Sequence, residues 1–260
     1  MNEPTVSVLQ RRVLAFDLDG TLAITKSPVS DTMANLLSRA LDLFEICVIS
    51  GGSFSQFDTQ LVRPLRLDPR RAARLHLMPT SGTRYYRYET TTTAWVQQYA
   101  EDLSDTEKSE AKDALRKAAE ELGFWEQEPA GPVIEDRASQ ITFSALGQEA
   151  TPDRKYRWDP DGIKKEALRI AVARALPDLE VRAGGTTSID VTRHGIDKAY
   201  GMRKLMEVLD LSPTDIAFFG DQLEIGGNDY AVKSAGIDTI AVRDPIDTQL
   251  ALEAILMVLT

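Results

Sequence analysis

The chain has 260 residues, of which 43% are hydrophobic and 27% are charged, and its formal net charge is −10. This composition fits a globular protein with a full hydrophobic core, and the acidic balance argues against nucleic-acid or membrane-surface partners, which need a basic face. No run of about 18 apolar residues occurs, and the N-terminal residues lack the apolar segment of a signal peptide. We therefore expect no membrane association and a cytoplasmic location.

The N-terminal third of the chain has the pattern of a parallel α/β sheet. Residues 13–20 read as a short buried strand that ends in a turn. Apolar residues then recur at helical spacing from Met33 to Phe44, and a second apolar run, residues 46–52, ends in glycines. A strand, a helix and a strand in this order predict parallel strands joined by a crossover helix.

Residues after about 84 have a different pattern, which predicts an inserted domain. The segment 85–100 is rich in aromatic residues and threonine, which favours antiparallel strands. Ser104 and Glu107 have the spacing of a capping box, which begins a helix that ends near Leu122. The remaining elements expected in this insertion are strands at 132–137, 139–146, 179–185 and 187–193 and a helix at 160–175.

Beyond residue 195 the first pattern returns. The elements expected there are a helix at 197–208, a buried strand at 215–221, a helix, a strand at 238–242 and a C-terminal helix. The predicted fold class is therefore α/β, with a Rossmann-like parallel-sheet core formed by residues 1–84 and 195–260. Residues 85–194 are expected to form an inserted α+β domain.

Acidic residues follow two of the predicted parallel strands. Asp17 and Asp19 come at the end of the first strand, Asp221 follows the strand at 215–221, and Asp229 can join from the next helix. The carboxyl ends of parallel strands meet at one edge of a sheet, so we expect these carboxylates to converge. Clustered carboxylates repel one another unless a cation neutralises them, and an all-oxygen ligand set favours Mg²⁺. The sequence therefore predicts a magnesium site.

Groups that can bind an anion are expected at the same edge, from Thr21, Ser50, Gly51, Gly52 and Lys198. Such donors beside a cation can surround a phosphoryl group. A carboxylate in line with phosphorus can attack it and form an aspartyl-phosphate, and a second acid can exchange protons with the leaving and attacking oxygens. We therefore predict that Asp17 is the nucleophile and that Asp19 is the general acid and base.

Each of these motifs also has a purely structural explanation. The DxDG motif can be a polar turn, the SGG motif a glycine turn, Lys198 a surface lysine, and the Asn228-Asp229 pair a helix cap. Their joint order, with every motif at a strand end or at a helix start, favours the functional interpretation.

The same motifs resemble those of a known superfamily. FDLDGT (16–21), VIS (48–50), Lys198 and GDQLEIGGND (220–229) are similar to the four motifs of the haloacid dehalogenase superfamily of phosphotransferases. The GGND end of the last motif, and GGTTSIDV (184–191), further resemble the eukaryotic-type phosphomannomutases, whose cap has a segment of the form GGxxSxDV. The resemblance covers nearly the whole chain and implies a Rossmann-like core with a sugar-phosphatase-type α+β cap, residues 85–194, that determines substrate specificity.

The resemblance implies a role for each matching residue. Asp17 would be the nucleophile and Asp19 the general acid and base, while Ser50 and Lys198 would hold the transferring phosphoryl group. The implied Mg²⁺ ligands are Asp17, the carbonyl of Asp19 and Asp221, with Asn228 and Asp229 in or beside the metal site. The implied substrate-binding residues are Lys26, at the position of a family arginine, Arg137, Gln148, Ser188 and Asp190, of which Ser188 and Asp190 would bind sugar hydroxyls.

One departure from the family separates two candidate functions. The mutases hold the distal phosphate of a bisphosphate intermediate with several cap arginines. Arg137 matches the first of these, Gln148 replaces the second, and a third can come from Arg154 or Lys155. A neutral glutamine lacks the forked, charge-assisted grip of an arginine on phosphate, which favours water as the acceptor.

The favoured prediction is therefore a Mg²⁺-dependent sugar-phosphate phosphatase that works through an aspartyl-phosphate. The alternative is a phosphomannomutase, a hexose 1-phosphate/6-phosphate mutase. A third hypothesis, a non-catalytic sugar-phosphate-binding protein, conflicts with the intact acid pair. The expected partner is a small sugar phosphate, and the family resemblance leaves open a homodimer formed through the cap.

Overall fold

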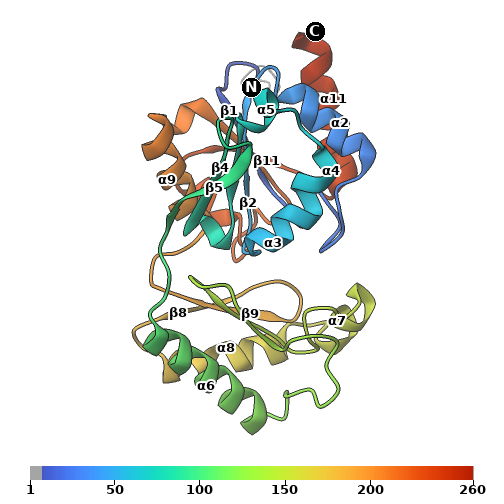
Figure 1. The fold of residues 1–260 in the computed structure, drawn as a ribbon. Helices are drawn as coiled ribbons and strands as arrows, with labels where there is room; N and C mark the ends of the chain where they lie inside the picture. The colour runs from blue at the N-terminus through green and yellow to red at the C-terminus, as the bar shows by residue number, and fades with distance from the viewer. Residues whose placement is uncertain (1–7, 260) are drawn as a thin grey trace. The chain divides into compact units, whose positions relative to one another are not determined.

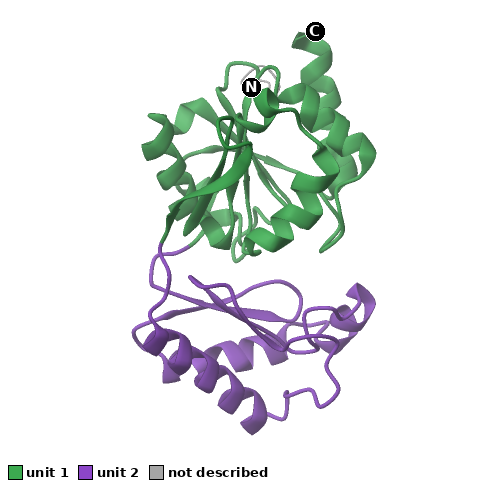
Figure 2. Ribbon diagram, viewed as in Figure 1, with its two compact units in different colours: residues 1–100, 197–260 green, residues 101–196 purple. Residues whose placement is uncertain are grey.

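The computed structural model describes residues 8–259 and divides the chain into two compact units (Figures 1 and 2). Unit 1 comprises residues 1–100 and 197–260, and unit 2 comprises residues 101–196. Each unit has its own hydrophobic core. Between residues 8 and 259, no helix combines the length and the apolar character needed to cross a membrane.

In the described residues, unit 1 contains one seven-stranded sheet with the order β11-β10-β1-β2-β3-β4-β5. Its strands are β1 (Val13–Asp17), β2 (Glu45–Ile49), β3 (Leu75–Met78), β4 (Arg84–Glu89), β5 (Ala94–Ala100), β10 (Ile216–Gly220) and β11 (Asp238–Ala241). The first three and the last two of these pair in parallel, whereas β4 and β5 are antiparallel. The predicted α/β fold class with a parallel core sheet is confirmed.

The helical elements of unit 1 are α2 (Asp31–Ala40), α3 (Phe54–Phe57), the π-helix η1 (Asp58–Val62), α4 (Arg63–Leu65), α5 (Pro69–Ala72), η2 (Thr80–Gly82), α9 (Lys198–Leu209), η3 (Pro213–Asp215), α10 (Tyr230–Ser234) and α11 (Pro245–Leu259). Figure 1 shows α9 on one side of the sheet and α2 and α11 on the other.

The central strands of unit 1 are buried on both faces. Leu14 and Phe16 of β1 pack in the core that contains side chains of α2 and α11. Val13 and Ala15 pack in the second core, with Cys47 of β2 and side chains of α9. Successive residues of a strand point to opposite faces, so a strand covered on both faces reads as an unbroken apolar run. This is why the sequence of β1 is recognisable.

Unit 2 contains a four-stranded antiparallel sheet with the order β6-β7-β9-β8, within the part of the chain that the structure describes. Its elements are α6 (Asp105–Glu121), β6 (Ile134–Asp136), β7 (Ile141–Ser144), α7 (Pro152–Trp158), α8 (Ile163–Ala175), β8 (Glu180–Ala183) and β9 (Ser188–Thr192). The predicted capping box begins α6, because the Ser104 hydroxyl accepts the Glu107 N–H and the Glu107 carboxylate accepts the Ser104 N–H.

The two faces of the unit 2 sheet differ in polarity. Phe143 and Ile189 lie opposite each other on β7 and β9 and pack in the core formed with α6 and α8. Thr142 and Asp190 form the neighbouring cross-strand pair and therefore lie on the other face. The alternation of apolar and polar residues along β7 and β9 thus leaves one polar face.

The first boundary of the predicted cap, residues 85–194, differs in the structure. β4 pairs with β3, and β5 pairs with β4, so residues 84–100 extend the core sheet. The second compact unit runs from Glu101 to Ile196 instead. The aromatic and threonine-rich pattern correctly indicates antiparallel strands, but it does not specify which sheet they join. The role of this unit in substrate specificity stays a prediction.

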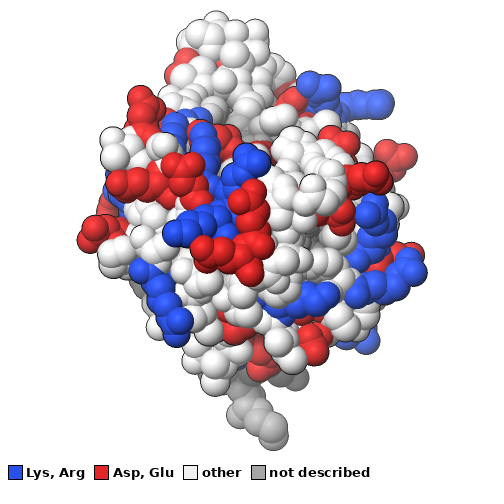
Figure 3. Space-filling view, turned by 90° about the horizontal axis from the view of Figure 1, so that it is seen from below, with Lys and Arg blue, Asp and Glu red and all other residues white. Residues whose placement is uncertain are grey.

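Charges of both signs are interspersed on the face of the molecule shown in Figure 3. Lysine and arginine side chains lie among aspartate and glutamate side chains on that face, without one continuous basic region. The expectation that no nucleic acid binds this protein stays a prediction.

Candidate active site

The predicted catalytic residues follow the central strands of unit 1. Asp17 is the last residue of β1, Ser50 follows β2, and Asp221 follows β10. Because β10, β1 and β2 are adjacent and parallel, their carboxyl ends lie at the same edge of the sheet.

Lys198 joins two of the carboxylates. Its Nζ donates to Oδ1 of Asp17 at 2.5 Å and to Oδ1 of Asp229 at 2.6 Å, and its side chain is buried. Lys198 is the first residue of α9, and the carboxylate of the preceding Asp197 caps this helix by accepting the N–H of Tyr200. The cap determines where α9 begins and therefore where the ammonium group lies.

Asp229 is fully buried and depends on close packing against the end of β10. Its Oδ2 accepts the backbone N–H of Gln222 at 3.1 Å. A Cβ atom at Gly220 would lie only 2.5 Å from the same oxygen, closer than any real contact of that kind. The glycine that ends β10 therefore leaves the space that Asp229 occupies.

Asp17, Asp221 and Asp229 form a cluster of carboxylates, each with an oxygen within 4.8 Å of the others, among residues 8–259. Burial raises the pKa of Asp17 to about 7, against the opposing effect of the Lys198 ammonium. Burial, and then the charge of Asp229, also raise the pKa of Asp221. Burial alone lowers the pKa of Lys198, but Asp17 and Asp229 outweigh it and raise this pKa above its usual value.

This cluster fits a hard divalent cation. Three buried or half-buried carboxylates face a single ammonium group, so their full ionisation leaves an excess of negative charge. All donors are oxygen atoms, which Mg²⁺ prefers. Asn228 is an exposed residue of the adjacent loop, and its place in a metal site stays a prediction, as does that of the Asp19 carbonyl.

Hydroxyl groups lie in the loops at this edge. Thr21 is fully buried, and its Oγ1 donates to Asp221 at 3.5 Å. Ser50 is buried, and its Oγ accepts the N–H of Gly52 at 3.2 Å, with Gly51 between them in the chain. The roles of Ser50 and Gly51 in binding a phosphoryl group stay predictions.

Asp19 has partners that the sequence analysis missed. Its Oδ2 accepts Nε2 of Gln56 at 2.9 Å, and its Oδ1 accepts Nε2 of Gln60 at 3.1 Å. Lys26 contacts Asp19 through its backbone N–H at 2.8 Å. The signal in the sequence is a pair of glutamines four residues apart after the SGG turn, which is the spacing of one helix face.

Three candidate substrate residues of unit 2, Arg137, Ser188 and Asp190, lie at the polar face of its sheet. Asp190 accepts a hydrogen bond from the Thr142 hydroxyl at 2.7 Å, and Gln140 donates to the same hydroxyl oxygen at 2.8 Å. The guanidinium of Arg137 contacts Glu135 at 2.7 Å. Burial raises the pKa of Asp190, while Arg137 and the hydrogen bond from Thr142 act in the opposite direction.

A lysine lies beside the glutamine that departs from the family pattern. Nζ of Lys155 donates to the backbone carbonyl of Gln148 at 3.1 Å, and Lys155 is buried. Ser188 is half-buried and lies opposite Ser144 on the neighbouring strand. The proposed contacts of Gln148 and Ser188 with substrate stay predictions.

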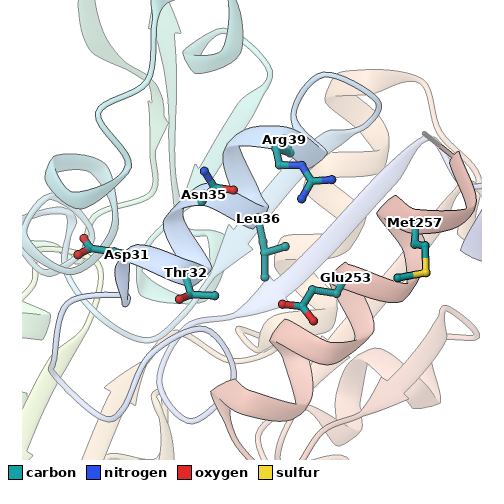
Figure 4. Close-up of a pocket in the computed structure, with 7 residues that line it drawn as sticks. All are labelled: Asp31, Thr32, Asn35, Leu36, Arg39, Glu253 and Met257. Atoms are coloured by element: carbon teal, nitrogen blue, oxygen red, sulfur yellow. The ribbon is translucent and has the colours of Figure 1, made fainter.

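A surface groove of about 680 Å³ lies elsewhere in unit 1 (Figure 4). It lies between α2 and α11 and is lined by Asp31, Thr32, Asn35, Leu36, Arg39, Glu253 and Met257. None of these is a predicted site residue, and the groove holds two acids against one arginine. The chemistry of the molecule therefore points to the carboxylate cluster rather than to this groove.

Known proteins are similar to this chain in sequence over most of its length. The family model described as eukaryotic phosphomannomutase matches residues 33–258. A probable phosphomannomutase of Caenorhabditis elegans is 25% identical over 256 residues, which cover 95% of this chain and 96% of the relative. Phosphomannomutase 1 of Homo sapiens is 23% identical over 254 residues, which cover 91% of this chain and 90% of the relative.

Solved structures show the same fold at low sequence identity. N-terminal truncated, IMP-bound IMP-nucleotidase of Plasmodium falciparum has a TM-score of 0.68 and 16% identity, covering 98% of this chain and 71% of that one. A haloacid dehalogenase-like hydrolase of Bacteroides thetaiotaomicron has a TM-score of 0.63 and 15% identity, covering 95% of this chain and 99% of that one.

Proposed function

Since the chain belongs to the eukaryotic phosphomannomutase family, we propose that it interconverts mannose 1-phosphate and mannose 6-phosphate in a Mg²⁺-dependent reaction. The observation that carries this proposal is the family-model match over residues 33–258, which takes in all of unit 2 and most of unit 1. The phosphomannomutases to which the chain is similar almost end to end also support it. These comparisons favour the mutase, the alternative in the sequence analysis, over the phosphatase.

The contacts of Asp17 support its role as the nucleophile. Its carboxylate is buried at the end of β1, and the ammonium of Lys198 holds one of its oxygens at 2.5 Å. This contact restricts the direction in which the carboxylate points, and a fixed nucleophile reaches a bound phosphorus atom at less entropic cost. The same ammonium offers positive charge to phosphoryl oxygens.

The donors around Asp17 fit Mg²⁺. Asp17, Asp221 and Asp229 would hold the ion, because each offers an oxygen to the same small region. When bound, Mg²⁺ neutralises these carboxylates and draws charge from the phosphoryl oxygens.

Phosphoryl transfer through Asp17 balances in two steps. In one, an oxygen of Asp17 bonds to phosphorus, and the bond from phosphorus to the sugar oxygen breaks as Asp19 gives that oxygen a proton. In the other, Asp19 takes the proton of a hydroxyl whose oxygen bonds to phosphorus, and the bond from phosphorus to Asp17 breaks. In a mutase this hydroxyl belongs to a sugar phosphate, whereas in a phosphatase it belongs to water.

A mutase must retain its bisphosphate intermediate, and the ammonium group of Lys155 can help to hold it. At position 148 the family pattern has an arginine, and here the Lys155 ammonium lies 3.1 Å from the Gln148 carbonyl. In our proposal Lys155 supplies the positive charge that Gln148 lacks. Arg137 supplies a second positive charge for the distal phosphate of the bisphosphate intermediate. Ser188 and Asp190 bind sugar hydroxyls.

The test is to incubate the purified protein with Mg²⁺ and mannose 1-phosphate, with and without a hexose bisphosphate, and to measure mannose 6-phosphate and inorganic phosphate together. We expect the 6-phosphate isomer, stimulated by the bisphosphate, with little free phosphate. Free phosphate without the isomer would overturn the mutase and favour the phosphatase. Substrate binding without either product would favour a binding protein.

A further inference from the structure

The side chain of Asp19 is held by a set of N–H donors that no catalytic motif contains. Among the described residues, the Gln56 and Gln60 side chains and the Lys26 backbone donate to it at 2.9, 3.1 and 2.8 Å. Together these donors occupy both carboxylate oxygens. The inference drawn from them rests on the proposed function, in which Asp19 exchanges protons with the substrate.

The orientation of Gln60 is determined by a second contact. Its Nε2 also donates to the backbone carbonyl of Ser27 at 2.8 Å, and its own backbone carbonyl accepts the N–H of Val29 at 2.8 Å. A carbonyl can only accept, so the amide nitrogen, and not the amide oxygen, must face both Ser27 and Asp19. Gln60 thus joins η1 to the loop that follows β1.

The position of Gln60 carries an energetic cost. The side chain is 3% exposed, and its Oε1 is buried without a donor among residues 8–259. A buried acceptor without a partner is unfavourable, so the fold tolerates this loss in order to point the amide nitrogen at Asp19. This orphaned oxygen is the observation that separates Gln60 from an ordinary buried glutamine.

Gln56 reaches Asp19 because position 52 is a glycine. A Cβ atom at Gly52 would lie 2.4 Å from Oε1 of Gln56 and 2.7 Å from its Cδ, and both distances are too short for a real contact. The Gln56 side chain therefore passes directly over the glycine turn that follows β2. Gln56 ends up beside Gln60, four residues on, where the π-helix η1 widens the helical segment.

We propose that Gln56 and Gln60 are positioning residues that fix the side chain of Asp19 for proton exchange with the sugar oxygen. Neither glutamine touches the reacting atoms; each acts through Asp19. The two glutamines should therefore affect the rate of steps in which Asp19 gives or takes a proton. Steps with a good leaving group need no such proton transfer and should not depend on the glutamines.

Two half-reactions test this role. Transfer from a sugar phosphate to Asp17 needs Asp19 to protonate a poor leaving group, whereas transfer from p-nitrophenyl phosphate releases a stable phenolate and does not. Gln56→Ala should lower kcat for mannose 1-phosphate isomerisation about tenfold, with KM within about twofold. The rate of the first p-nitrophenol burst should stay within about twofold of wild type.

Further variants define the role and control for folding. Gln56→Glu keeps the shape but replaces the N–H donor by an acceptor, so it should lose isomerisation as Gln56→Ala does. Gln98→Ala removes an exposed glutamine of β5 whose side chain donates to the Val96 carbonyl, and it should behave as wild type. Gln60→Ala is a less specific test, because it also removes the side-chain contact with the Ser27 carbonyl, which supports the loop after β1.

The outcomes separate this inference from the proposed function. A wild-type protein that neither isomerises mannose 1-phosphate nor releases p-nitrophenol would overturn the proposed function itself. An active wild type with an unchanged Gln56→Ala variant, or with equal losses in both half-reactions, would overturn the positioning role alone. Full isomerisation by Gln56→Glu would also overturn it, because the donor would then be dispensable.

Discussion

The carboxyl edge of the unit 1 sheet and the polar face of the unit 2 sheet use polar residues in different ways. At the edge, Asp17, Lys198 and Asp229 are buried, and the lysine ammonium contacts both carboxylates. On the face, Asp190 is held by the neutral hydroxyl of Thr142 and lies only half-buried. The edge concentrates opposed charges, which suits a reaction, whereas the face presents directed hydrogen bonds, which suit the recognition of hydroxyl groups.

This difference predicts two classes of variant. Substitutions at the edge should stop phosphoryl transfer from every substrate, because they change the reacting group or its charge. Substitutions on the face should change which substrate reacts and where the phosphoryl group goes.

The largest effect is expected for Asp17→Asn. The amide that replaces the carboxylate cannot form an aspartyl-phosphate, so turnover of both mannose 1-phosphate and p-nitrophenyl phosphate should fall by at least about a thousandfold. Lys198 keeps its contact with Asp229, so circular dichroism should show an intact fold. Retained activity would refute the nucleophile assignment.

Lys198→Met should destabilise unit 1 strongly. It leaves Asp17 and Asp229 buried without their cation, and breaking a buried ion pair costs about 3–5 kcal/mol. The free energy of unfolding, measured in urea, should fall by about that amount, and Mg²⁺ should restore part of it. Lys204→Met is the matched control, because Lys204 lies on the same helix at a half-exposed position, where its ammonium pairs with Glu207 at 3.9 Å and lies over the rings of Tyr99 and Tyr200. A loss equal to that of the control would contradict the prediction.

Asp190→Ala should affect the sugar substrate selectively. Without this carboxylate, kcat/KM for mannose 1-phosphate should fall about tenfold, while that for p-nitrophenyl phosphate, which lacks sugar hydroxyls, should change by less than about twofold. Asp113→Ala, at an exposed position of α6 in the same unit, serves as the control. Equal losses on both substrates would exclude a sugar-binding role for Asp190.

Lys155→Met should change the destination of the phosphoryl group. If Lys155 helps to retain the bisphosphate intermediate, its loss should raise the ratio of free phosphate to mannose 6-phosphate about fivefold, which is a modest effect for one charged contact. Simultaneous measurement of both products gives the ratio. An unchanged ratio would show that Lys155 does not retain the intermediate. Gln148 and the remaining cationic side chains would then be the groups to substitute.

The smallest effect is expected for Glu107→Gln, in the first turn of α6. The hydrogen bond from Arg193, and then the N–H of Ser104, lower the pKa of Glu107 to about 2. A lowered folded-state pKa adds stability that is complete above about pH 4.5 and is lost as the pH falls towards 2. The variant should lose about 0.5–1 kcal/mol of unfolding free energy at pH 7 and lack this acid-dependent loss.

Hydrogen exchange of the backbone amides of α6, measured as a function of pH, tests this prediction within unit 2. Glu120→Gln, which removes only an exposed pair with Arg116, should be nearly neutral. A Glu107→Gln variant that unfolds with the same pH dependence as wild type would show that the charge of Glu107 and its pair with Arg193 contribute little.

The sequence predicts the residues at the carboxyl edge of the unit 1 sheet better than it predicts the outer strands of that sheet, and the reason is physical. β1 is buried on both faces, so its apolar run and the acids that follow it stand out together. β3 is only four residues long, and β4 is rich in tyrosine but does not alternate between buried and exposed residues. Local patterns of that kind do not say which sheet a strand joins, so the boundary of the insertion is displaced.

The partners of Asp19 show a second limit. Gln56 and Gln60 belong to a helical segment with a π turn, and Gln56 needs the space above Gly52. Helical spacing places both glutamines on one face of the segment, but only packing shows which carboxylate that face meets. Residues that act through another residue leave a weaker signal in the sequence than the reacting groups do.

Cys47 gives the molecule a chemical reporter of unit 1. It is the only cysteine of the chain, and it lies fully buried in β2, where burial raises the pKa of its thiol. A thiol reagent can therefore modify it only when the core sheet opens. Its rate of modification would follow the opening of unit 1 without interference from residues 101–196, which contain no thiol.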